Sequence, residues 1–96
     1  MTHEITDQMI NDAVDRLDTS AIRKAMVALD WRWTSAEDGI PSEYEVRKSA
    51  RKLCGYVKKY GGMCASGGLK AETYDDGEMQ GISIVFELTE SIGVTQ

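Results

Sequence analysis

The residues of this sequence best suited to chemistry are cations at helical spacing. Residues 46–70 contain seven Lys and Arg residues and no acid, although the whole chain has a net charge of −5. At about 100° per residue, six of these cations would share one face of a helix, within an arc of about 140°. They are Arg47, Lys48, Arg51, Lys52, Lys58 and Lys59. A face of this kind can neutralise several phosphates or bind an acidic protein surface.

Two interpretations of this face stay open. It can project outward and bind a partner, or the acidic segments 1–45 and 71–96 can neutralise it within the protein. Tyr56 borders the arc and could stack on an exposed base. Gly55 lies inside the arc, where a glycine costs about 1 kcal/mol of helix stability relative to Ala. We therefore expect either a ligand or another element of the fold to approach the helix closely at Gly55.

Residues that could support catalysis lack suitable partners. His3 lies near the N-terminus, where we expect no fixed geometry. Cys64 would follow the C-terminus of a helix, whose dipole disfavours a thiolate. Asp75 and Asp76 are typical of a hairpin turn. We predict no enzyme activity, no metal site and no cofactor, and the presence of only two cysteines favours a reducing compartment.

Trp31 and Trp33 are the second candidate for a binding surface. Trp31-Arg32-Trp33-Thr34 alternates bulky and polar residues, which could form a short strand with the two indoles on opposite faces. One indole would then fill the core, and the other would be partly exposed as an interface anchor. The alternative is that both fill the core of a small domain.

Periodicity predicts three helical segments before residue 61. Apolar residues predict a helix from about 7 to 17 with Thr6 as its N-cap, and a second stripe follows between 19 and 29. Whether these are one kinked helix or two stays open. A capping box at 42–45 begins a helix over 43–60 that ends at Gly61 and Gly62. Its predicted apolar face comprises Val46, Ala50, Leu53, Cys54, Val57 and Tyr60.

The last third predicts a β-hairpin after a glycine-rich loop at 61–68. Its strands would cover 69–74 and 79–88 around a turn at 75–77, with the chain after Glu90 loose. The core face would carry Ile82, Ile84, Phe86 and Leu88. We therefore predict one domain over 1–96 of class α+β, with two or three helices packed on a small antiparallel sheet that includes this hairpin. The order of the strands stays open.

The order of these pieces resembles small uncharacterised proteins encoded by tailed phages and prophages. The resemblance covers roughly residues 26–90 and rests on 30–33, Ile40-Pro41-Ser42, Leu53, the glycine-rich break and the strand end at 84–88. It implies a compact α+β fold, a phage or prophage source, and an accessory role in host takeover. It implies no catalytic residues.

These observations together predict a non-catalytic binding protein of the cytoplasm, without a membrane segment or a secretory signal. We expect a host protein as the partner. The alternative partner is a nucleic acid, bound through the six cations. Self-association through the edge of the 82–88 strand also stays open. The predicted binding surface comprises the six cations, Tyr56 and whichever of Trp31 and Trp33 is exposed.

Overall fold

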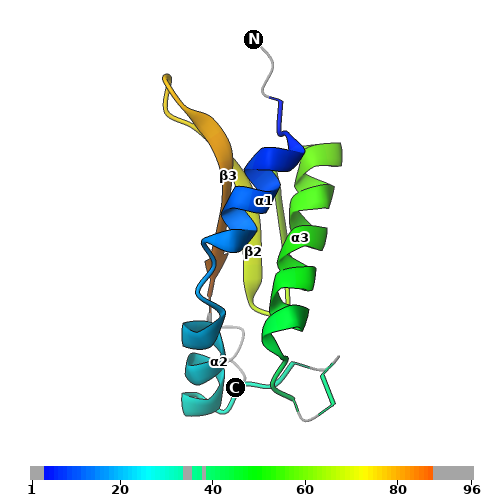
Figure 1. The fold of residues 1–96 in the computed structure, drawn as a ribbon, viewed down its shortest axis with the longest axis vertical. Helices are drawn as coiled ribbons and strands as arrows, with labels where there is room; N and C mark the ends of the chain where they lie inside the picture. The colour runs from blue at the N-terminus through cyan, green and yellow to red at the C-terminus, as the bar shows by residue number, and fades with distance from the viewer. Residues whose placement is uncertain (1–3, 34–35, 38, 88–96) are drawn as a thin grey trace, which may run out of the picture.

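The computed structural model describes residues 4–33, 36–37 and 39–87. Within them the chain forms the helices α1 (Asp7–Asp15), α2 (Thr19–Ala28) and α3 (Glu43–Tyr60). The strands β1 (Met63–Ser66), β2 (Leu69–Asp75) and β3 (Gln80–Phe86) follow. The strands form an antiparallel sheet in the order β1-β2-β3, and the helices pack against it (Figure 1). The predicted α+β class is therefore confirmed, whereas His3, Leu88 and the tail after Glu90 lie outside the described residues.

Separate caps divide the first helical segment into two helices. The Thr6 hydroxyl accepts a hydrogen bond from the Met9 amide at 3.2 Å at the start of α1. The Asp18 carboxylate accepts one from the Ala21 amide at 3.0 Å at the start of α2. A side-chain cap satisfies amides that lack a partner within the first turn of a helix, so each cap starts a new helix. The question that periodicity left open is thus answered by two short helices.

Helix α3 begins and ends as predicted. Ser42 and Glu45 form the capping box, and Gly61 ends the helix with a φ of +78°. Five of its six predicted core residues are buried: Val46, Ala50, Leu53, Cys54 and Val57. The prediction for Tyr60 is wrong, because this last residue of the helix is 69% exposed and its ring stacks on Tyr56 instead of entering the core.

The core lies between one face of the sheet and helices α1 and α3, and α2 adds the buried Ile22 and Met26 to it. Helix α3 packs against β1 and β2, and α1 packs against β3, so the two helices lie side by side over the sheet (Figure 1). Cross-strand pairs such as Ala71 with Ile84 place small and branched side chains on this face. The hairpin predicted for the last third is observed with nearly the same bounds, and β3 is an edge strand of the described sheet.

Part of the segment predicted as a glycine-rich loop is strand β1. Gly67 and Gly68 have φ values of +55° and +83° and join β1 to β2 as a two-residue turn. Positive φ at both central positions is the requirement of the commonest two-residue hairpin turn. The sequence Met-Cys-Ala-Ser lacks the alternation of apolar and polar residues that marks a half-buried strand, which is why periodicity did not reveal it.

The possible strand over 31–34 is absent from the described residues 31–33, and Thr34 lies outside them. The Trp31 amide donates to the Met26 carbonyl at 2.9 Å, which closes the C-terminus of α2 with Asp30 at a φ of +54°. The Trp33 amide donates to the Gly39 carbonyl at 2.7 Å. Both donors are therefore engaged by a helix end and a loop, so neither pairs with the sheet.

Candidate binding surface on helix α3

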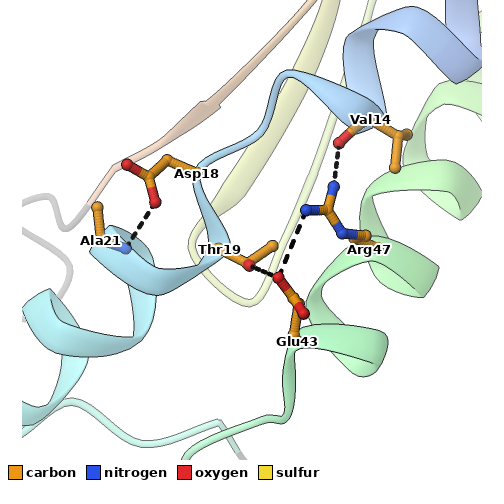
Figure 2. Close-up of polar contacts among 6 residues, drawn as sticks. All are labelled: Val14, Asp18, Thr19, Ala21, Glu43 and Arg47. Atoms are coloured by element: carbon orange, nitrogen blue, oxygen red, sulfur yellow. Dashed lines mark hydrogen bonds and ion pairs between the residues drawn. The ribbon is translucent and has the colours of Figure 1, made fainter.

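Two of the six predicted cations contact polar groups of α1 or α3, and Arg47 is the first of them. Its guanidinium donates to the Val14 carbonyl at 2.7 Å and lies 3.5 Å from the Glu43 carboxylate. The same carboxylate accepts a hydrogen bond from the Thr19 hydroxyl at 2.8 Å. Figure 2 shows this network joining the first turns of α3 to the last turn of α1 and the first residue of α2. A cation beside the last carbonyls of α1 also complements the dipole of that helix.

The Glu43 carboxylate is stabilised in its charged form by these contacts. The hydrogen bond from Thr19 and the charge of Arg47 hold its pKa below the ordinary value of 4.5. Arg47 is thus a structural residue that links three helices, and its charge is balanced by a neighbour within the fold.

Lys58 is the second engaged cation. Its ammonium group lies 2.7 Å from the Asp7 carboxylate, in the first turn of α1. This hydrogen bond and the charge of Lys58 lower the pKa of Asp7. Because α1 and α3 run in opposite directions, Arg47 and Lys58 join the two ends of the pair of helices. We call these two residues the paired margin of α3.

The other four predicted cations form an exposed cluster, which we call the cationic patch. It consists of Lys48, Arg51, Lys52 and Lys59. Among the described residues, none of the four has an ion-pair or side-chain hydrogen-bond partner. Their spacing of three, four and seven positions places them on one side of the helix, over a length of about 16 Å. The open question about the basic face is therefore answered in part: two cations are neutralised, and four remain available.

Gly55 lies at the centre of the cationic patch. Arg51 and Lys52 lie four and three positions before it, and Lys59 lies four positions after it. All three are therefore its neighbours on the helix surface. A Cβ built at Gly55 meets no atom within 4 Å apart from its chain neighbours and the adjacent helix backbone. Packing against the described part of the fold therefore does not require this glycine, although it costs the helix about 1 kcal/mol relative to Ala.

Two exposed tyrosines border the patch on the side away from α1. Tyr56 and Tyr60 are 44% and 69% exposed, and their rings stack with centroids 6.4 Å apart and planes inclined by 21°. The ammonium group of Lys59 lies 5.2 Å from the centroid of the Tyr60 ring. We call these two residues the tyrosine pair. The sequence prediction missed Tyr60, although a spacing of four positions from Tyr56 is a signal that the rings can meet.

A surface hollow of about 510 Å³ adjoins the N-terminal half of the patch. Lys48 and Lys52 line it together with Tyr44, Trp33 and Glu45. The Glu45 carboxylate accepts a hydrogen bond from the Ser42 amide at 3.2 Å as part of the capping box. A fixed carboxylate at its wall makes this hollow a poor pocket for a small anion. The exposed outer side of the helix is the better candidate surface.

The two tryptophans close the end of the core instead of joining the patch. Trp33 is buried with 7% exposure, and a Cβ at Gly67 would overlap its indole. Trp31 is half-buried, covers Gly68 and packs against the Phe86 ring at a centroid distance of 5.8 Å. The turn between β1 and β2 therefore needs glycines for space as well as for backbone conformation.

The two cysteines are the remaining reactive groups among the described residues. Burial raises the pKa of the Cys54 thiol to about 11, so it is protonated at neutral pH and unreactive. Cys64 is half-buried and also unbonded to another cysteine. No group of three or more His, Cys, Asp or Glu side chains within residues 4–33, 36–37 and 39–87 could hold a metal ion. In the same residues, no helix is both long and apolar enough to cross a bilayer.

Comparison with protein-family models, curated proteins and solved structures gives no match to this chain. The structure brings Lys48, Arg51, Lys52, Tyr56 and Lys59 together on the outer side of α3 and engages Arg47 and Lys58 elsewhere.

Proposed function

We propose that this chain is a non-catalytic binding protein that engages an anionic macromolecule through the cationic patch. The observation that carries the proposal is the absence of any ion-pair partner for Lys48, Arg51, Lys52 and Lys59 among the described residues, next to two cations on the same helix that are paired. An unpaired cation can meet an external anion without first losing a partner in its own fold.

The length of the patch favours a polymer over a small ion. Its four charges extend over about 16 Å of helix, and a single phosphate group cannot contact all of them. A chain of anions can do so, because it presents a new charge every few ångströms. Apart from the hollow beside Lys48 and Lys52, the patch lies on the convex outer side of a helix, whereas sites for small molecules are concave and bury most of the ligand.

The acidic remainder of the protein limits the strength of this binding. The net charge of −5 repels a polyanion at long range. Attraction at the patch acts at short range, so we expect a dissociation constant of roughly 10⁻⁴ to 10⁻⁶ M that weakens steeply with salt. The phage accessory role and a host protein partner stay predictions. An acidic protein surface would satisfy the same charges, but lysine is depleted in protein interfaces, and three of the four cations are lysines.

Retention on immobilised heparin tests the proposal with two variants of equal net charge. Lys52→Glu reverses a charge within the patch, and Lys24→Glu reverses one at an exposed position of α2 outside it. We expect Lys52→Glu to elute at clearly lower salt than the wild type and Lys24→Glu to elute close to it. Equal shifts would show that net charge controls retention, and no retention of the wild type would contradict the proposal outright.

A further inference from the structure

The proposed binding function leaves two features of α3 unexplained. One is Gly55, which destabilises the helix without serving its packing. The other is the tyrosine pair, which exposes two aromatic rings beside the cations when burial would stabilise the fold. A partner made of charge alone, such as a sulfated polysaccharide, would use neither feature. A partner with both a backbone of anions and flat rings would use both.

We infer that the polyanion is a single-stranded nucleic acid, whose phosphates follow the cationic patch across Gly55 and whose bases stack on Tyr56 and Tyr60. This inference rests on the proposed function. Single strands are bound in this way in general, by cations along the backbone and aromatic rings against the bases. At the spacing of about 3.4 Å per phosphate along one DNA strand, the patch would match about five nucleotides.

Gly55 gives the backbone of the strand a point of close approach. Arg51, Lys52 and Lys59 surround it, and the missing side chain leaves the helix backbone uncovered between them. A phosphate above Gly55 could therefore reach all three cations at short range, where attraction is strongest. An alanine methyl group would hold the phosphate farther from the helix.

The tyrosine pair favours a single strand over a duplex. Bases in a duplex are stacked on one another and offer no face to Tyr56 or Tyr60, whereas an unpaired strand does. A duplex that enclosed α3 in its major groove would also bring a phosphate strand toward α1, which exposes Asp12 and Asp15. Stacking on Tyr56 and Tyr60 would accept the flat face of any base, so we expect binding with little sequence preference.

Fluorescence anisotropy with a labelled oligothymidylate of about ten nucleotides, twice the length of the patch, tests this inference. The comparison probes are a duplex of the same length, heparin and polyglutamate. We expect the single strand to bind at least several-fold more tightly than the duplex and polyglutamate. With four phosphate contacts, log K should fall with log salt at a slope of about −3.

Three variants test base stacking on the tyrosines and the close approach of the phosphate backbone at Gly55 separately from the attraction between charges. Tyr56→Leu and Tyr60→Leu should each weaken oligothymidylate binding by about five- to a hundredfold and leave heparin retention unchanged. Gly55→Ala should melt several degrees higher, because Ala favours the helix, and yet bind the oligonucleotide several-fold more weakly. Gain of stability with loss of binding cannot come from damage to the fold.

The outcomes distinguish failure of the inference from failure of the proposed function. If heparin binds but the single strand binds no more tightly than the duplex, the inference is wrong and the binding function survives. The inference is also wrong if polyglutamate binds more tightly than the oligonucleotide, which would indicate an acidic protein, or if the tyrosine and glycine variants bind normally. If no polyanion binds, both are wrong.

Discussion

Helix α3 carries two groups of cations that differ in what they contact. The paired margin, Arg47 and Lys58, faces α1 and forms hydrogen bonds of 2.7 Å with Val14 and Asp7. The cationic patch lies farther around the same helix and has no ion-pair partner among the described residues. Both groups consist of arginine and lysine side chains, and each extends over eleven positions of α3. Position relative to α1 therefore decides which cations stabilise the fold and which are available to a partner.

Replacing equivalent arginines of the two groups should give the largest difference in stability. Arg47→Met removes the hydrogen bond to the Val14 carbonyl and should lower the free energy of unfolding by about 1–2 kcal/mol. Arg51→Met, one helical turn away, should change it by less than about 0.5 kcal/mol, because the side chain is exposed and unpaired. Urea denaturation measures both. Equal losses would mean that the division into two groups has no energetic basis.

Polyanion binding should show the opposite order for the same two variants. Arg51→Met removes a charge from the patch and should weaken heparin retention. Arg47→Met should retain nearly normal binding at temperatures where it is folded. A crossed pattern of this kind would sharpen the comparison, because neither global destabilisation nor net charge can produce it.

The neighbouring lysines Lys58 and Lys59 provide a smaller and closely matched contrast. Lys58→Met removes the ion pair with Asp7 and should slightly lower the melting temperature at low salt, with less effect at high salt. Lys59→Met should leave the melting temperature unchanged and reduce heparin retention. Thermal melts at two salt concentrations measure the first effect. A salt-independent loss in Lys58→Met would contradict an electrostatic role for this pair.

Acid titration should give the smallest effect, part of which depends on the carboxylates that contact the paired margin. The pKa values of Asp7 and Glu43 are held below their ordinary values of 3.8 and 4.5. Lowered values mean that the charged carboxylates stabilise the fold above the ordinary pKa, and that this contribution is lost as pH falls through the lowered values. Thermal melts between about pH 6 and pH 2 should show a smaller acid-induced loss in Arg47→Met than in Arg51→Met. Identical pH profiles would contradict the coupling of Arg47 to Glu43.

The elements marked by local signals were predictable from the sequence. Thr6, Asp18 and the capping box at Ser42 each start a helix, because a side chain there satisfies backbone amides within a few residues. The hairpin of β2 and β3 followed from alternating apolar residues around a turn. These signals act over short distances along the chain, so they need no knowledge of the rest of the fold.

The elements that depend on distant contacts were missed. Strand β1 has no apolar alternation and pairs with β2 through its backbone, beside a turn of two glycines. The sequence placed at least one of Trp31 and Trp33 in the core but left open which one; Trp33 is buried where Gly67, more than thirty positions later, leaves room for its indole. Tyr60 lies at the margin of the apolar arc, where periodicity does not distinguish the core from an aromatic contact with Tyr56.

The sequence by itself determined that six cations share one face of a helix, because a helix turns by about 100° per residue. It also determined where that helix begins and ends, because the caps at Ser42 and Gly61 are local. Only the tertiary structure decided that Arg47 and Lys58 belong to the fold and that Lys48, Arg51, Lys52 and Lys59 remain available. That division depends on where α1 packs against α3, and a contact between residues 51 positions apart, such as that of Asp7 with Lys58, leaves no local pattern.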